Sequence, residues 1–191
     1  MTVIAPERKY TPDDLLTLPE GKHLELVNGR LVEKERGAEA AWTSGELLTE
    51  LKLFVRGAGC GRIFPSEMGY QCFAEDRNRI RKPDVSFVSA ERLPEDWRTY
   101  GFFPFPPDLA VEVVSPNDLY SEVTRKVREY LDAGVKLVWV LDPEARCAEV
   151  HRADGTSAFL REDGELTGEG VLPGFQCALG GLFGTPAANQ G

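Results

Sequence analysis

The sequence predicts one α/β or α+β domain, with a mixed central sheet flanked by helices, from three observations. Candidate helices and strands are interleaved along the chain, which is typical of layered sheet-and-helix folds. Residues 135–143, VKLVWVLDP, form a nearly continuous apolar run, as expected of a strand that lies deep in a sheet covered by helices. The length of 191 residues and the hydrophobic fraction of 42% suit a single domain with a substantial core. We expect this domain to span residues 1–184, followed by a flexible tail at 185–191.

The first elements are a short helix and a hairpin. The segment YTPDDLLTLPE, residues 10–20, predicts a helix with Thr11 as its cap and Pro12 at its first position. The segment HLELVNGRLVEK, residues 23–34, alternates apolar and polar residues around an Asn-Gly pair at 28–29. That pattern is a strong signal for two strands joined by a tight turn.

A long helix is expected next, at Trp42–Arg56, because apolar residues recur there at helical spacing and Gly57 can end it. The glycines of GAGCG, residues 57–61, resemble a phosphate-binding loop. This segment follows a helix instead of opening one, so it predicts a helix stop and a turn into a strand. Two or three extended segments then follow, at 61–66, 69–74 and 82–89.

The second half of the chain repeats this alternation. The loop YGFFPFPPD carries three phenylalanines that cover either the core or a partner. A buried strand, DLAVEVVSPND at 108–118, precedes a helix expected at Leu119–Ala133 and ended by Gly134. An Asp-Gly pair at 154–155 predicts a second hairpin, and the last apolar segment, 172–184, should pack back on the body.

Composition excludes several classes of protein. The formal net charge of −9 argues against a general nucleic-acid coat protein, although it leaves room for a local basic groove. The chain has no apolar stretch near the roughly 20 residues that cross a bilayer and no secretion signal at its start, so we expect it in the cytoplasm. Four well-separated cysteines without a CxxC pair predict reduced thiols and no zinc or redox motif, at Cys60, Cys72, Cys147 and Cys177.

Glu112 is unexpected, because it is a carboxylate in the middle of the apolar run at 109–114. Burying a charged carboxylate without a partner costs several kcal/mol, so something should sit opposite it. Asp84 opens another strand-like run after Pro83, and the two acids converge at one end of the sheet if their strands are neighbours. A divalent ion relieves the repulsion between them, and donors that are all oxygen favour magnesium or manganese over zinc.

The helix after Glu112 adds a candidate amine. At 100° per residue, Lys126 falls at the edge of the apolar face, while Arg125 and Glu129 should point away. An inward-facing lysine beside metal-binding acids could orient an attacking water and stabilise charge that develops on phosphorus. The structural alternative is a lysine whose stem covers apolar surface while its amine reaches solvent.

The segment RNRIRKPD carries the densest basic cluster of the chain. A polyanion could be guided by four side chains, Arg77, Arg79, Arg81 and Lys82. The alternative is a solvated strand edge, where basic residues discourage aggregation.

Three blocks in this order resemble the Uma-two group of putative restriction endonucleases, a branch of the PD-(D/E)XK nuclease superfamily. The blocks are RKPDVSFV, PDLAVEVVSPND and KVREYLDAGVKLVWVLDPEA, and the resemblance extends over most of the chain, from about HLELVNGRLVE to LPGF. It implies a restriction-endonuclease-like core, a sheet between helices, and metal-dependent phosphodiester cleavage. The two hairpins predicted above would be additions to this core at its N-terminal and C-terminal ends. By position, Asp84 is the motif aspartate and Glu112 the motif acidic residue.

The chain departs from the superfamily pattern at Val114, where the usual acidic-x-Lys signature has its lysine. The resembled branch commonly carries a lysine on the following helix, and Lys126 matches that position. Many members of the superfamily also have an additional glutamate from the first helix. Three residues are candidates for it, Glu46, Glu50 and Glu25.

We therefore expect a magnesium- or manganese-dependent endonuclease, with double-stranded DNA as the substrate that the resemblance implies. Asp84, Glu112 and the backbone carbonyl of Val113 would hold the ion, and Lys126 would position the water or compensate charge. A homodimer is expected, because cutting a duplex needs two active centres. The alternative is a nuclease-like fold without turnover that binds nucleic acid or protein, which Val114 and the acidic balance favour.

Overall fold

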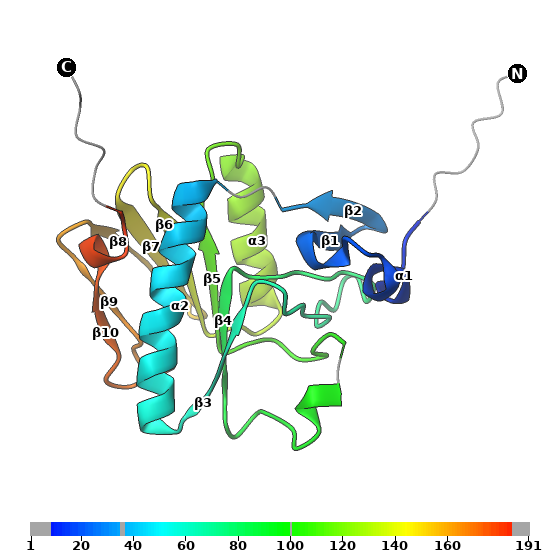
Figure 1. Ribbon diagram of the computed structural model, residues 1–191, viewed down its shortest axis with the longest axis horizontal. Helices are drawn as coiled ribbons and strands as arrows, with labels where there is room; N and C mark the ends of the chain where they lie inside the picture. Colours follow the sequence, from blue (N-terminus) through cyan, green and yellow to red (C-terminus); the bar gives the residue numbers. More distant parts are fainter. Residues whose placement is uncertain (1–8, 35–36, 100, 185–191) are drawn as a thin grey trace, which may run out of the picture.

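A six-stranded mixed sheet forms the centre of the fold in the computed structural model, which describes residues 9–34, 37–99 and 101–184 (Figure 1). The strands follow the order β3-β4-β5-β6-β7-β8. Their bounds are β3 Gly61–Pro65, β4 Val85–Ser89, β5 Leu109–Val113, β6 Leu137–Asp142, β7 Cys147–Arg152 and β8 Ser157–Arg161. β5 and β6 are parallel and the other neighbours antiparallel, so the predicted mixed sheet is confirmed.

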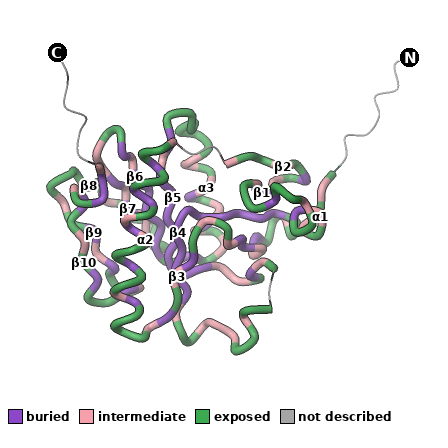
Figure 2. Tube along the Cα trace, viewed as in Figure 1, coloured by how far each residue is buried: buried purple, intermediate pink, exposed green. Residues whose placement is uncertain are grey.

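Two helices cover opposite faces of this sheet (Figure 1). Odd-numbered residues of β4, β5 and β6 pack with α2 (Ala38–Ala58), whereas even-numbered residues of β5 and β6 pack with α3 (Tyr120–Asp132). This division follows from the alternation of side chains along a strand. Figure 2 shows the consequence, with the central strands buried and the outward surfaces of both helices exposed.

The ends of α2 differ from the expected bounds. The helix begins four residues before Trp42 and continues to Ala58, with Gly57 inside it. Gly59 ends it instead, with a φ of 64° and an N–H that donates to the Val55 carbonyl at 2.9 Å. A left-handed residue is the usual way to stop a helix, and Gly adopts it without steric cost. The GAGCG segment is thus a helix stop, as predicted.

The N-terminal elements follow their sequence signals. α1 (Pro12–Thr17) is capped by Thr11, and β1 (Leu24–Val27) pairs with β2 (Arg30–Glu33) across a turn at 28–29 with positive φ at both positions. This hairpin stands outside the main sheet. It docks on the body through two backbone hydrogen bonds between Leu26 and Ile80, of 3.1 and 2.8 Å.

The remaining segments complete the core. Of the three extended segments expected after α2, two form β3 and β4, while Tyr70 makes only isolated bridges. Phe103 of the aromatic loop is buried with Phe64 and Tyr70, so this ring covers the core. The second hairpin joins β7 to β8 as predicted.

The C-terminal segment packs back on α2, as expected, and adds a ribbon that the sequence did not predict, β9 (Glu165–Thr167) with β10 (Gln176–Ala178). Within the described ranges, three 3-10 helices also occur, at Gly21–His23, Trp97–Thr99 and Leu179–Gly181. No described helix is both long and apolar enough to cross a bilayer. The tail expected at 185–191 lies outside the described residues.

Candidate functional site

The pairing of β4 with β5 brings Asp84 and Glu112 together. The strands are antiparallel with Val85 opposite Val111, so continuing this register by one residue sets Asp84 opposite Glu112. The Asp84 amide donates to the Val111 carbonyl at 2.8 Å, which holds the chain in line one residue beyond the strand. Directly opposite residues of an antiparallel pair point to the same face. The two acids therefore lie side by side on the face that α3 covers.

Asp84 is fixed by the backbone of β5. Its Oδ2 accepts a 2.8 Å hydrogen bond from the amide of Val113, and its side chain is almost fully buried. The N–H and C=O of one strand residue point to the same side, so the Val113 carbonyl also lies on the side of Asp84. Carboxylate and carbonyl oxygens thus face the same space at the end of β5.

Glu112 is neutralised from α3, which explains a carboxylate in an apolar strand. Tyr130 donates a 2.6 Å hydrogen bond to its Oε1, and the Lys126 amine lies 3.0 Å from its Oε2. Burial and the charge of Glu112 both raise the pKa of Tyr130, which stays a donor. Tyr130 lies on the apolar face of α3 with Val127, but the apolar pattern carries no signal for the role of its hydroxyl.

Lys126 turns inward, as the helical spacing predicted. Burial alone would lower the pKa of its amine, but the charges of Glu112 and Glu25 outweigh burial and raise the pKa. Lys126 is therefore a cation at neutral pH. It can stabilise negative charge or orient a water, and it cannot accept a proton as a base.

Glu25 is the one of the three candidate additional acids that lines the cavity with Asp84 and Glu112. It is 1% exposed and reaches the site from β1. Glu46 and Glu50 lie on α2, the helix on the other face of the sheet.

The charge of Glu25 is held by the residues around it. Its oxygens accept 2.8 Å hydrogen bonds from the Arg81 guanidinium and the Lys82 amide. Burial tends to raise its pKa, but the charges of Lys126, Lys34 and Arg81, with the Lys82 amide, bring it below the usual value.

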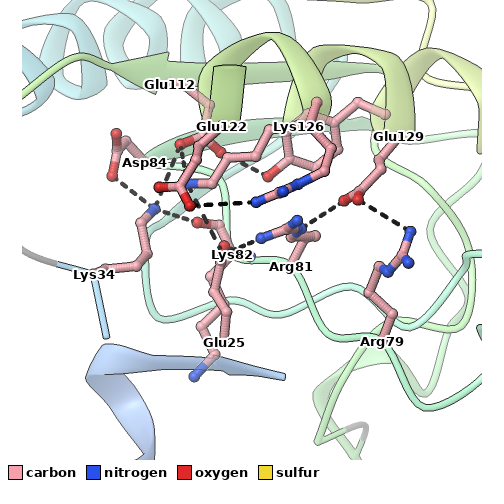
Figure 3. Close-up of polar contacts among 12 residues, drawn as sticks. Glu25, Lys34, Arg79, Arg81, Lys82, Asp84, Glu112, Glu122, Lys126 and Glu129 are labelled. Carbon is pink, nitrogen blue, oxygen red and sulfur yellow. Dashed lines mark hydrogen bonds and ion pairs between the residues drawn. The ribbon is translucent and has the colours of Figure 1, made fainter. Parts of the chain in front are cut away.

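The predicted basic cluster is mostly turned into the molecule (Figure 3). Arg81 and Lys82 are each 2% exposed, and Arg81 binds Glu129 at 2.7 Å as well as Glu25. Arg79, also buried, lies 3.1 Å from Glu129, so the expectation that Glu129 points away from the protein was wrong. Of the four basic residues, Arg77 alone is exposed. Contact of this cluster with a nucleic acid stays a prediction.

Lys34 enters the site from the end of β2 and was not among the predicted site residues. Its amine lies 3.0 Å from Asp84 Oδ1 and 3.8 Å from Glu112 Oε2, and it also donates to the Lys82 carbonyl (Figure 3). The alternation within the hairpin carries no signal for this role. Only the docking of the hairpin on the body reveals it.

A cavity of about 110 Å³ has Glu25, Lys34, Asp84, Glu112 and Lys126 in its wall. A wider cleft of about 530 Å³ adjoins it, because Val27, Val32 and Arg125 line both hollows. The basic residues of this cleft are Lys9, Arg30, Arg79 and Arg125, and its one acid is Glu129. We call it the basic cleft.

The donor set is compatible with a hard divalent ion. In the described part of the chain, no three His, Cys, Asp or Glu side chains are grouped so that they could hold a metal. Magnesium does not need such a group, because it commonly binds through one or two carboxylates and keeps several waters or substrate phosphates as its other ligands. Asp84, Glu112 and the Val113 carbonyl meet that requirement with oxygen atoms alone.

Comparisons with known proteins agree with this fold. A family model described as "putative restriction endonuclease", Uma2, matches residues 12–180. The chain is also similar to a crystal structure from Anabaena variabilis, described as a putative nuclease belonging to DUF820. That match has a TM-score of 0.77 and 21% sequence identity and covers 91% of this chain and 97% of the other. No curated protein matches the sequence.

Proposed function

Since the chain belongs to the Uma2 family of putative restriction endonucleases, we propose that it is a metal-dependent endonuclease that hydrolyses phosphodiester bonds of double-stranded DNA. One observation carries the proposal. Two acids from adjacent strands, Asp84 and Glu112, meet the cationic amine of Lys126 in the wall of one cavity. Acids that bind a metal beside a fixed cation are groups that can catalyse phosphodiester hydrolysis.

Each residue has a role that its geometry supports. Asp84, Glu112 and the Val113 carbonyl would hold magnesium or manganese, which would supply Lewis-acid polarisation of the scissile phosphate and a water of lowered pKa. Lys126 positions the attacking water or offsets the charge that grows on phosphorus. Val114 follows Glu112 by two residues and lines the same cavity. The amine absent from position 114 is thus supplied to the same space from α3.

The basic cleft supports a polyanionic substrate in spite of the net charge of −9. Phosphate contacts position a nucleic acid without reading its sequence, and arginine is well suited to make them. A nucleic-acid strand lying in the cleft would pass the cavity, because the two hollows share lining residues. Duplex cleavage would require two such centres, which a homodimer supplies.

Plasmid nicking in the presence of magnesium tests this function. Asp84→Asn and Glu112→Gln should each lower the nicking rate by about 100-fold or more, since each removes charge that the transition state depends on. Glu46→Gln, a matched loss of one acid on α2, should cut like the parent. If both site variants cut as well as the parent, the assigned site is wrong.

A binding module without turnover is the second candidate, and one observation favours it. The amines of Lys34 and Lys126 already pair with Asp84 and Glu112, so the acids are neutralised by the protein itself. Calorimetry separates the two functions. A module would bind DNA tightly and in a salt-sensitive way, and would show no divalent-ion binding that depends on Glu112.

A further inference from the structure

The amine of Lys34 stands where oxygen atoms of the candidate site converge. Its neighbours are Asp84 Oδ1 at 3.0 Å, Glu112 Oε2 at 3.8 Å and the carbonyl of Lys82. These are the kinds of ligand that a hard cation takes. Figure 3 shows the side chain reaching from the end of β2 toward Asp84.

The position of Lys34 is set by the fold. Its backbone amide donates to the His23 carbonyl at 3.0 Å, which extends the β1–β2 ladder by one residue. Its side chain is 11% exposed, so the amine has exchanged much of its contact with water for contact with these oxygens. Such an exchange is favourable only where charged partners replace the lost solvation.

The other oxygens of the two acids are already engaged. Asp84 Oδ2 accepts from the Val113 amide, Glu112 Oε1 accepts from Tyr130, and Glu112 Oε2 lies 3.0 Å from Lys126. Asp84 Oδ1 is therefore the carboxylate oxygen that Lys34 holds at 3.0 Å. A divalent ion bound to Asp84 Oδ1 at about 2.0–2.1 Å, the distance magnesium demands, would put a second positive charge beside the amine of Lys34. The repulsion between the two cations disfavours the amine in this place.

We propose that Lys34 is an internal counter-cation of the site, and that a divalent ion binds Asp84 and Glu112 only by displacing its amine. This inference rests on the proposed function, because it takes these acids as the metal ligands. In this role, Lys34 sets the concentration of divalent ion that the site needs for binding. If the amine of Lys34 is away from the acids in one molecule out of ten, the apparent dissociation constant for the ion is about tenfold higher than that of the open site.

Titration calorimetry with magnesium, and separately with manganese, tests this on the full chain. Lys34→Met removes the charge and keeps the length of the side chain, and Lys34→Gln serves as a second, polar variant. Both should bind each ion about tenfold more tightly than the parent. Arg125→Gln removes an exposed charge from the lining of the same cavity without breaking a contact to Asp84 or Glu112. It should change the dissociation constant by less than about twofold at 0.15 M salt, because an exposed charge is screened.

Thermal unfolding gives a second readout. Without added metal, the Lys34 variants should unfold at a lower temperature than the parent, because the acids lose their counter-cation. Saturating magnesium should then raise the unfolding temperature of these variants more than that of the parent.

The outcomes separate the two proposals. Equal or weaker metal binding by both Lys34 variants, with binding still lost in Glu112→Gln, would overturn the role of Lys34 and keep the metal site. If neither the parent nor the Lys34 variants bind either ion, the counter-cation role and the proposed metal-dependent cleavage fall together. Tighter binding in both Lys34 variants, but not in Arg125→Gln, is the result that we expect.

Discussion

Tyr130 and Glu112 are joined by a 2.6 Å hydrogen bond from the phenol to Oε1, in the buried space between β5 and α3. Lys126 approaches the other oxygen of the same carboxylate from one helical turn earlier. One face of α3 therefore fixes both oxygens of Glu112. The orientation of this acid depends on the helix as much as on its own strand.

Tyr130→Phe should test that dependence, because it removes the donor and leaves a buried carboxylate oxygen unsatisfied. We expect the free energy of unfolding to fall by about 1–3 kcal/mol, measured by urea denaturation. Tyr120→Phe is the matched control on the same helix, since its side chain is 80% exposed. An equal effect of the two substitutions would contradict the importance of the hydrogen bond.

Lys126→Met should lower the rate of magnesium-dependent nicking by about 100-fold, as loss of a fixed charge-stabilising group typically does. Because the pKa of Lys126 is raised, its amine stays protonated up to pH 9 and the parent should show no change of rate that depends on its ionisation. Rate profiles between pH 6 and 9 check this point. Lys52→Met, which removes an exposed amine from α2, serves as the control. If Lys126→Met cuts at the same rate as the parent, this amine takes no part in the reaction.

Arg125 and Arg128 are neighbours on α3, and only Arg125 lines the basic cleft. Arg125→Ala should weaken binding of duplex DNA in the absence of divalent ions. It should also reduce the slope of log affinity against log salt by about 0.9, the value for one phosphate contact. Arg128→Ala should leave the slope unchanged. Fluorescence anisotropy at several salt concentrations measures the affinity and its slope for each variant. A larger effect of Arg128→Ala than of Arg125→Ala would show that DNA does not bind in the basic cleft.

Asp108 lies at the start of β5, at the end of the strand away from the site. Burial tends to raise its pKa, but hydrogen bonds from Lys136, the Ser89 amide and Arg92 lower it below its usual value. An acid with a lowered folded-state pKa stabilises the protein above its unfolded pKa, near 4, and that stability is lost as the pH falls through the folded value.

Asp108→Asn should therefore lower the free energy of unfolding by about 1–3 kcal/mol at pH 7. The difference from the parent should shrink as the pH falls below about 4, because the unfolded parent then binds a proton at this carboxyl group while the folded parent binds it only at lower pH. Urea denaturation at pH 7, 5 and 3 measures the difference. Glu91→Gln, at an exposed position, should show little effect at any pH, and a pH-independent loss in Asp108→Asn would show that its charge is not the cause.

Much of the fold could be predicted because its signals are local. Thr11 and Pro12 mark the start of α1, and the apolar alternation of β1 and β2 around an Asn-Gly turn specifies a hairpin. The positions of Asp84, Glu112 and Lys126 also follow from short-range patterns, once β4 and β5 are neighbours. The prediction that Gly57 ends α2 was wrong, because two further glycines follow it and only backbone conformation identifies the one that ends the helix.

The rest of the site could not be predicted, because it depends on segments that meet only in three dimensions. The docking of Leu26 on Ile80 carries Glu25 and Lys34 to the acids. The same contact between Leu26 and Ile80 turns Arg81 inward, although the sequence of its segment is typical of an exposed basic strand edge. Glu129 is off the apolar face of α3, yet the loop that contains Arg79 covers it.

The parallel pairing of β5 with β6 has a consequence for how the protein is made. Parallel neighbours need a crossover, and here the crossover is α3, which carries Lys126 and Tyr130. A chain leaves the ribosome from its N-terminus, so Glu112 emerges before either of these partners. Nascent chains that end before Tyr130 hold a carboxylate that no helix can neutralise. The candidate site is thus completed only when synthesis has passed the crossover.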